Sequence, residues 1–505
     1  MRPLPLSPPR SRRRLVLALT GALALALPAA ASANVALTRV RSDTFTNTSS
    51  QHQTIVEPDT YSFGSTTVAA VQMGRFFDGG ASDIGFATTT NNGASWTGAR
   101  LLGITTFAGG GAYNRATDPS VAYDARHNVW LISSLALVDT PNGPTGKAVL
   151  TSRSTNGGLT WGSPVNTAVA GATEDFDKNW IVCDNTSTSP FYGSCYTQFD
   201  DFGHGNLLKM YYSRDGGLTW TAGRTPRAGV IGGQPVVLPN GNVVVPLDNA
   251  FETALGYTIS TNGGAKFGQA FVITSIAAAD DPGNIRSGPL PSAEIAGDGK
   301  IYVVWEDCRF RAGCPAAGTP NDLVYVTSTN GSTWSAVQRI PIDAVTSTVD
   351  HFLPGVGVDR TTSGASTRVG VTYYFYPNTN CTPATCQLSV GYISSANGGS
   401  SWSSATQLAG PMTMSWLPDT SQGRMVGDYI STSFGSDGLA HPVFTVAKVP
   451  TAGGSDCATA TPNCDQAAYS PTTGLAASGG SAVANDPVLF TGSVGGGHSE
   501  FKRLR

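Results

Sequence analysis

Arginine and acidic residues recur together along this chain, close to the start of successive apolar stretches. Only 13% of the residues are charged, so these repeated groups are a prominent feature. A planar guanidinium matches a carboxylate in bidentate geometry, and clustered ionisable groups are typical of functional sites. We therefore select Arg75, Arg115, Asp177, Arg286, Arg309 and Arg424 as candidate ligand-binding residues, and Asp118, Glu294, Asp350, His351, Asp428 and Tyr429 as candidate catalytic residues.

Each of these residues also has a structural interpretation. Asp118 precedes a proline and could cap a turn through its side-chain oxygens. Asp177 and Lys178 could form a solvated ion pair, and Arg309 could orient a disulfide loop because it follows Cys308 directly. His351 could be a core histidine with satisfied hydrogen bonds. The functional interpretation therefore rests on the set as a whole.

A repeated turn organises the elements that must position these residues. The pattern is Ser/Thr-x-Asp/Asn-x-Gly-x-Ser/Thr-Trp, and Asp or Asn in such a turn accepts hydrogen bonds from free backbone N–H groups. The glycine supplies a positive φ, and the tryptophan begins the next strand and buries its ring. Six copies occur, two of them degraded, at residues 89–96, 154–161, 213–220, 260–267, 328–334 and 395–402.

An apolar, strand-like run precedes each repeated turn, and a second hairpin precedes that run. Two hairpins in series form a four-stranded antiparallel unit, and radial repetition of such units is the β-propeller. We count seven units and therefore predict an all-β, seven-bladed propeller, with six blades as the alternative. Residues 34–505 form a single propeller domain in this interpretation, and residues 35–40 could close the ring beside the last blade.

The first 33 residues have the features of an export signal. Five arginines precede the apolar run 15–27, and Ala31-Ser32-Ala33 fits a signal-peptidase site. Removal of this segment shifts the formal net charge from −3 to −8 because it contains no acidic residue. A net negative chain without a basic cluster is unsuited to nucleic acid. We therefore expect a secreted protein without a membrane anchor or nucleic-acid partner; its oligomeric state is not indicated.

The eight cysteines form four close pairs in the sequence. An even number of locally paired cysteines in an exported chain predicts disulfides, here Cys183–Cys195, Cys308–Cys314, Cys381–Cys386 and Cys457–Cys464. The sequence contains no CxxC or HExxH spacing that would indicate zinc. It also contains no Asp-x-Asp-x-Asp-Gly loop that would indicate calcium. We expect no metal or other cofactor, with calcium as the alternative because many Asp and Asn residues fall in loops.

The six turns resemble the Asp boxes, also called BNR repeats, of the sialidase superfamily. The resemblance covers residues 84–402 and implies a propeller in which the boxes are structural and lie on the face away from the active site. It also implies three arginines that hold a substrate carboxylate, a Tyr nucleophile paired with a Glu, and an Asp acid/base. The Arg-Ile-Pro sequence that precedes the first box in sialidases occurs here as 339–341, after the fifth turn. We therefore interpret Arg339 as part of an outer strand.

The resemblance implies a sialidase-like exo-glycosidase that acts on an acidic sugar such as sialic acid. In this hypothesis the carboxylate is held by arginines, the acid/base is Asp118 or Asp350, and Tyr429 is the nucleophile with Glu294 as its partner. Two alternatives remain open. One is a polysaccharide lyase in which His351 and a tyrosine remove the proton next to a uronate carboxylate. The other is a non-catalytic propeller that binds a glycan or a protein.

Overall fold

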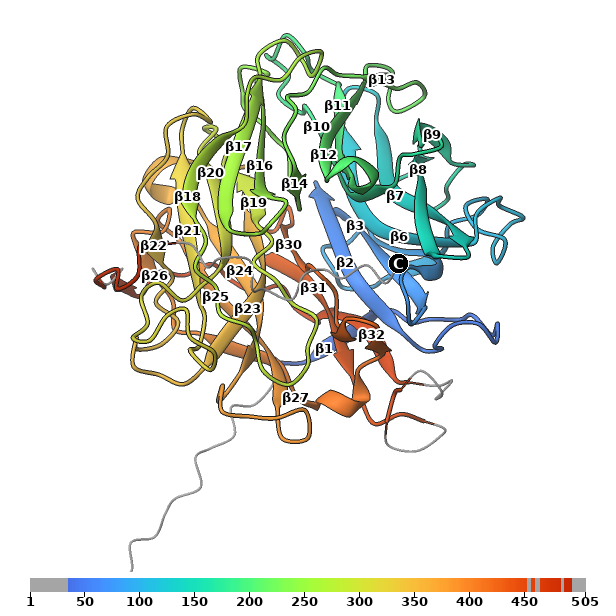
Figure 1. The fold of residues 1–505 in the computed structure, drawn as a ribbon. Helices are drawn as coiled ribbons and strands as arrows, with labels where there is room; N and C mark the ends of the chain where they lie inside the picture. Colours follow the sequence, from blue (N-terminus) through green and yellow to red (C-terminus); the bar gives the residue numbers. More distant parts are fainter. Residues whose placement is uncertain (1–34, 452–455, 459–463, 483–485, 493–505) are drawn as a thin grey trace, which may run out of the picture. The chain divides into compact units, whose positions relative to one another are not determined.

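The computed structural model describes residues 35–451, 456–458, 464–482 and 486–492. The predicted export signal, 1–33, lies outside the described residues. Within the described ranges, no helix is long and apolar enough to cross a membrane. Residues 34–505 form one unit, and its sheets are arranged as antiparallel blades of a β-propeller (Figure 1).

The first half of the unit contributes three sheets. An eight-stranded sheet contains β2 (Ile55–Phe63), β3 (Thr66–Arg75), β4 (Ala81–Thr89), β5 (Thr97–Arg100), β6 (Arg115–Asp124), β7 (Val129–Thr140), β8 (Gly143–Ser154) and β9 (Val165–Val169). The next contains β10 (Phe176–Cys183), β11 (Cys195–Asp201), β12 (Leu207–Ser213) and β13 (Thr221–Ala222). A five-stranded sheet follows, with β14 (Val230–Ile231), β15 (Val236–Val237), β16 (Val243–Asn249), β17 (Ala254–Ser260) and β18 (Phe271–Ser275).

The second half contributes three four-stranded sheets. They are β19 (Ser292–Ile295) with β20 (Ile301–Asp307), β21 (Asp322–Ser328) and β22 (Gln338–Arg339); β23 (Asp350–Val358) with β24 (Val369–Tyr376), β25 (Gln387–Ser395) and β27 (Thr406–Thr413); and β30 (Ser431–Phe434) with β31 (Ala440–Ala447), β32 (Gln466–Pro471) and β1 (Leu37–Arg41). Arg339 lies on an edge strand, as predicted. Short pairs and single turns complete the unit: β26 (Ser401–Trp402) with β33 (Ser481–Ala482), β28 (Asp419–Thr420) with β29 (Gly423–Arg424), and the 3-10 turns η1 (Phe202–His204), η2 (Gly364–Ser366) and η3 (Met414–Trp416).

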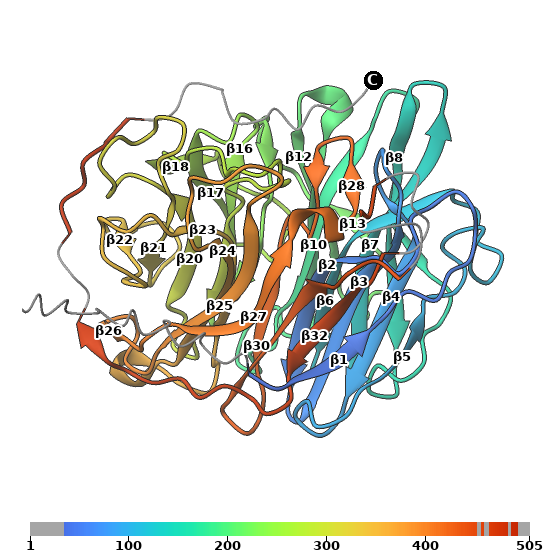
Figure 2. The same ribbon diagram turned by 90° about the horizontal axis from the view of Figure 1, so that it is seen from below.

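The N-terminal strand closes the ring. Strand β1 pairs antiparallel with β32, so a strand from each end of the unit completes one sheet (Figure 2, blue and red). This pairing confirms the predicted closure. Main-chain hydrogen bonds between β1 and β32 therefore hold the two ends of the ring together.

The core lies in the layers between neighbouring sheets. One buried cluster joins Phe352, Tyr374 and Leu388 of one sheet to Phe444 and Ala467 of the next. Blades packed face to face exclude water from the alternate residues of each strand. The sheets therefore hold the first residues of the inner strands at fixed places around the axis.

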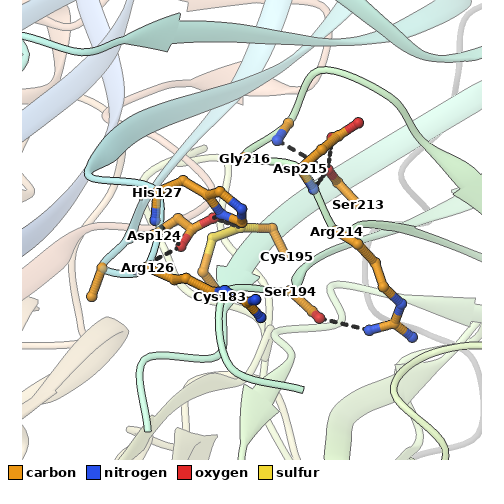
Figure 3. A network of polar contacts seen from close by, with 12 residues as sticks. Asp124, Arg126, His127, Cys183, Ser194, Cys195, Ser213, Arg214, Asp215 and Gly216 are labelled. Carbon is orange, nitrogen blue, oxygen red and sulfur yellow. Dashed lines mark hydrogen bonds and ion pairs between the residues drawn. A yellow bond between two sulfur atoms is a disulfide. The ribbon is translucent and has the colours of Figure 1, made fainter. Parts of the chain in front are cut away.

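The repeated turns have the hydrogen bonds that the sequence predicts. In the third copy, the Ser213 hydroxyl donates to Asp215 Oδ1 at 2.8 Å, and the Gly217 and Thr219 amides donate to Ser213 Oγ and Asp215 Oδ1 at 2.9 and 3.0 Å. Gly217 has φ +79°, which a side chain would disfavour. Equivalent bonds to Asn side chains occur in the other five copies. Figure 3 shows Ser213 and Asp215 in this turn.

The four predicted disulfides are present, and the structure has no free cysteine among its described residues. Cys183–Cys195 joins the end of β10 to the start of β11 (Figure 3). Asp124 lies beside this bridge and accepts a hydrogen bond from the His127 ring at 2.6 Å. The disulfide therefore fastens a hairpin end on the face that carries the repeated turns.

Candidate functional site

A β-bulge recurs near the start of four inner strands. The register shifts between Val56 and Asp59, Thr117 and Ser120, Asp177 and Trp180, and Phe352 and Gly355. The residue at each bulge has a left-handed backbone: φ is 53° at Glu57, 48° at Asp118, 51° at Lys178 and 49° at Leu353. Non-glycine residues rarely adopt this conformation, and a bulge redirects a side chain. The repetition therefore indicates that these side chains are held in position by the fold.

Three of the bulge residues meet Asp428 and Arg286 at the centre of the ring. The Arg286 guanidinium donates to both oxygens of Asp428, with Nε 2.6 Å from Oδ1. The Lys178 ammonium also contacts Asp428, and its Nζ lies 3.8 Å from Asp118 Oδ1. Glu57 Oε1 accepts a hydrogen bond from the Asp428 amide at 3.4 Å. We call Glu57, Asp118, Lys178, Arg286 and Asp428 the hub cluster.

Glycine at position 427 permits this close approach. A Cβ atom at Gly427, which has φ +147°, would lie 2.7 Å from the Glu57 backbone nitrogen. On the other side of Glu57, the Gln72 amide donates to Glu57 Oε2 and, at 2.7 Å, to Thr117 Oγ1. Glu57 is therefore fixed by two elements as well as by its own bulge.

Burial and charge divide the acids of the hub into two kinds. Burial raises the pKa of Glu57 to about 8 and that of Asp118 to about 6; for Asp118 the Lys178 charge opposes the rise and the Asp177 charge adds to it. Burial would also raise the pKa of Asp428, but Arg286 and Lys178 outweigh it and hold that pKa well below its ordinary value. At neutral pH Asp428 is therefore ionised, whereas Glu57 retains its proton.

A further carboxyl group, Glu252, belongs to the same electrostatic environment. Burial raises the pKa of Glu252 to about 7, while the charges of Lys178 and Arg286 lower it. Arg75 is also buried, and burial together with the charge of Arg286 lowers its pKa to about 10. Three cations and several protonatable acids therefore share a poorly hydrated centre.

Tyr429 lies next to the hub cluster. Its hydroxyl donates to the Pro119 carbonyl at 3.0 Å, and its ring meets Trp180 edge-on at 5.1 Å between centroids. Burial, followed by the charges of Glu57 and Asp118, raises the pKa of Tyr429 well above its ordinary value. The phenol is therefore neutral, and it could attack a substrate only with a base to accept its proton.

A small cavity of about 20 Å³ adjoins these groups, lined by Asp118, Lys178, Trp180, Gln234, Asp428 and Tyr429 among others. This volume holds about one water molecule. A sugar ring could enter only if the surrounding loops moved or if it bound at the outer edge of the cluster.

The structure brings only some of the predicted arginines together. Arg286 and Arg75 interact electrostatically at the hub, and the Arg286 amide donates to the Arg424 carbonyl at 2.7 Å. The remaining side chains have separate acidic partners. Arg115 contacts Asp78 and Asp139, Arg309 contacts Asp307, and Arg424 lies 2.8 Å from Asp456.

Asp350 and His351 lie in buried networks of their own. Asp350 accepts a hydrogen bond from the Asn321 amide at 2.7 Å, and burial followed by the charge of Asp281 raises its pKa well above its ordinary value. Burial lowers the pKa of His351, whose Nε2 lies 3.8 Å from Asp343. Neither residue contacts the hub cluster through a described hydrogen bond or ion pair, so no observation favours the lyase hypothesis built on His351.

One group has ligand types and spacing that could hold a metal: Asp322, Asp343 and His351. Arg311 and Arg339 each donate to both carboxylates of this group, for example Arg311 Nη2 to Asp343 Oδ1 at 2.9 Å. Two guanidinium groups already neutralise these acids, and their positive charges would repel a cation. The arrangement is therefore a structural ion network.

Glu294, the predicted partner of Tyr429, lies elsewhere. It is paired with Arg360 at 2.9 Å in a pocket at the far ends of the inner strands. The carboxyl groups whose charges act on Tyr429 are instead Glu57 and Asp118.

Glu57, Lys178 and Glu252 are not among the catalytic and ligand-binding candidates selected from the sequence. One signal could have found Glu57: an acidic residue followed by proline opens two successive inner strands, as Glu57-Pro58 and Asp118-Pro119.

No sequence profile of a known family and no curated protein sequence matches the chain. Several solved structures are similar in fold. An intramolecular trans-sialidase from Ruminococcus gnavus is 11% identical, with 64% of this chain and 90% of that chain covered and a TM-score of 0.44. A sialidase from Trypanosoma rangeli is 13% identical, with 72% and 59% covered and a TM-score of 0.45. A Dyadobacter fermentans protein of unknown function is 16% identical, with 71% and 98% covered and a TM-score of 0.45. Sialidases are thus among the solved structures that are similar to this chain, and the chemistry of the chain rests on its own side chains.

Proposed function

We propose that the protein is a secreted glycoside hydrolase that acts on an acidic sugar, with sialic acid as one candidate. One observation carries this proposal: two buried carboxyl groups, Glu57 and Asp118, lie at the centre of the ring beside Arg75, Lys178 and Arg286, and burial raises the pKa of both. Environments that push the pKa values of two carboxyl groups apart are typical of acid/base pairs.

The order of these pKa values assigns the roles. Between about pH 6 and about pH 8, Glu57 keeps its proton and Asp118 is ionised. Glu57 would then donate its proton to the leaving-group oxygen, and Asp118 would accept one from the nucleophile, either Tyr429 or a water. The bond from the anomeric carbon to the leaving group breaks as the bond to the nucleophile forms. A water nucleophile completes hydrolysis in this step. If Tyr429 attacks, a second step is needed in which the Glu57 carboxylate deprotonates a water, the water displaces the Tyr429 oxygen from the anomeric carbon, and Asp118 returns the proton to that oxygen.

The charge of the hub favours an anionic substrate. Between about pH 6 and about pH 7, Arg75, Lys178 and Arg286 are charged while Glu57 and Glu252 keep their protons. The ionised acids Asp118 and Asp428 then leave this group with excess positive charge. The excess positive charge would attract a substrate carboxylate bound at the outer edge of the cluster, and the attraction is strong because the site is poorly hydrated. The proposal therefore includes an acidic sugar, either a sialoside or a uronic-acid glycoside.

The test is sugar release from a panel of sialosides and uronic-acid glycosides across the pH range. We expect a bell-shaped dependence of kcat/KM with limbs near about pH 6 and about pH 8, and a loss of at least about a hundredfold in Asp118→Asn and Glu57→Gln. Asp139→Asn is the matched control because its carboxylate is half exposed and pairs with Arg115. If the wild-type protein releases no sugar from any member of the panel, hydrolysis is excluded for these substrates.

The small volume of the hub cavity favours a second candidate, a non-catalytic glycan-binding propeller. Asp428 is already matched by two cations, and the adjoining cavity holds about one water molecule. Binding on a glycan array without turnover would support this alternative.

We also infer seven blades and secretion. The eight-stranded sheet consists of two four-stranded runs joined through the single pair Ala81–Ala116, so counting each run as a blade gives seven with the other five sheets. Four disulfides are consistent with an oxidising compartment outside the cytosol.

A further inference from the structure

A second pocket opens at the other end of the inner strands. Its volume is about 350 Å³, which lies within the range of small-molecule sites. The final residues of β2, β10, β15, β19, β23 and β30 form its wall. The Asn92 amide of the first repeated turn donates to the Ser65 carbonyl, just beyond β2, so this mouth faces the side that carries the repeated turns. The hub cluster lies near the starts of the same strands and is therefore at the opposite mouth.

Four polar side chains converge in this pocket. Arg360 donates from Nη2 to Glu294 Oε2 at 2.9 Å and from Nη1 to the Tyr61 hydroxyl at 3.0 Å. The Asn185 amide donates to the same hydroxyl at 3.1 Å. Arg360 and Glu294 are only partly covered, with side-chain exposures of 33% and 26%. Both groups can therefore offer hydrogen bonds to a bound molecule while holding each other in place.

Each carboxylate among the described lining residues has a cationic partner, and the partner of Asp359, Arg368, lies outside the lining. Glu294 pairs with Arg360, and the other lining carboxylate, Asp359, pairs with Arg368 at 2.9 Å. Burial would lower the pKa of Arg360, but Tyr61 and Glu294 outweigh it and raise that pKa, so the guanidinium stays charged. A pocket with paired charges and with both strong donors and strong acceptors suits a neutral polyhydroxylated ligand better than an anion or a cation.

Aromatic and hydroxyl groups complete the lining. Phe63 is 44% exposed, and its ring packs on Tyr123 with the centroids 4.3 Å apart. Arg360 lies over the Tyr61 ring, 5.0 Å from its centroid. Ser433 lines the pocket and is 2.8 Å from the Thr60 hydroxyl. An aromatic face beside fixed donors and acceptors fits the apolar face and the equatorial hydroxyls of a pyranose.

We propose that this pocket binds a neutral sugar unit. Glu294 accepts from one hydroxyl, Arg360 donates to its neighbour, and Phe63 covers a face of the ring. The inference goes beyond the proposed hydrolysis, because it concerns a different mouth of the ring and requires no turnover there.

The test is a titration of the full chain by saturation-transfer NMR with methyl β-D-galactopyranoside, methyl α-D-glucopyranoside and N-acetylneuraminic acid. We expect a neutral methyl glycoside to bind. Arg360→Gln should raise the Kd of that glycoside by about tenfold or more, because a charged hydrogen bond is lost. Phe63→Ala should also weaken binding, and because that side chain is exposed, this variant retains the fold. Arg126→Gln is the matched control: its side chain donates to the Tyr192 carbonyl, outside the pocket residues.

The hub variant Asp118→Asn distinguishes this proposal from the proposed hydrolysis. It should leave the binding of the neutral sugar unchanged even if hydrolysis is lost. Three results would overturn the proposal. They are no binding of either neutral glycoside, binding that Arg360→Gln and Phe63→Ala leave unchanged, and preference of the pocket for N-acetylneuraminic acid.

Discussion

Replacing Glu57 by glutamine should remove much of the pH dependence of stability above about pH 4.5. Glu57 is 1% exposed, and its pKa is raised from 4.5 to about 8. The folded state therefore holds this proton more tightly than the unfolded chain. Stability is fully present below the unfolded pKa and is lost as the pH rises through the folded pKa.

The size of the effect follows from that interval. A rise from 4.5 to about 8, at about 1.4 kcal/mol per pH unit, corresponds to on the order of 5 kcal/mol lost between those limits. Asp118 contributes in the same direction over a lower window, from 3.8 to about 6. Glutamine carries no charge and keeps one acceptor oxygen, which can accept from either the Gln72 amide or the Asp428 amide. The variant should therefore be more stable than the wild type at about pH 8 and similar to it at about pH 4.5.

The assay is equilibrium unfolding in guanidinium chloride, followed by tryptophan fluorescence, for wild type and Glu57→Gln at about pH 5 and about pH 8. Glu174→Gln is the control, because Glu174 forms a partly exposed pair with Lys209 and its pKa is lowered. The pH dependence of stability that Glu174 contributes therefore lies below pH 4.5, outside the range in which Glu57 acts. If wild type and Glu57→Gln lose the same stability between the two pH values, Glu57 is not a buried neutral acid and the acid role assigned to it fails.

Three further predictions concern stability. Asp428→Asn should destabilise the fold by about 3–5 kcal/mol because it leaves the buried Arg286 without its counter-charge and Lys178 with Asp118 alone, 3.8 Å away. Asp139→Asn, which removes a half-exposed partner of Arg115, should change stability by at most about 1 kcal/mol. Urea denaturation compares the two variants, and equal effects would contradict a buried ion cluster. Asp215→Ala should lower stability by about 1–2 kcal/mol without altering any sugar release, and loss of turnover without loss of stability would argue against a structural turn. Replacing both Cys183 and Cys195 by serine should lower stability by at most about 3 kcal/mol, since the bridge closes a short loop; failure to fold would show that this bridge is essential.

Local features of the fold were predictable from the sequence. The six repeated turns, the four disulfides and the pairing of the first strand with the last sheet depend on residues close together or on strand pattern. A turn needs a glycine at positive φ and a side-chain acceptor two residues after a hydroxyl, and both are visible in seven or eight letters. The antiparallel propeller followed from repeating that unit.

Membership of the hub was only partly predictable. The structure brings four of the selected candidates close together, namely Asp118, Arg286, Asp428 and Tyr429. Glu294 was paired with Tyr429 on position along the blade alone. Glu294 begins no bulge, and its side chain meets Arg360 at the opposite mouth. A one-residue bulge decides which face a strand residue presents, and the sequence marks it only by a following proline, if at all.

The sequence by itself determined the repeating hairpin, its covalent bridges and the surplus of arginines and acids near the starts of inner strands. Only the tertiary structure decided which of these charges meet. Arg286 and Asp428 are 142 residues apart, and Lys178 and Asp428 are 250 apart. Closure of the ring brings such residues into contact, and the exclusion of water there sets which acids keep their protons.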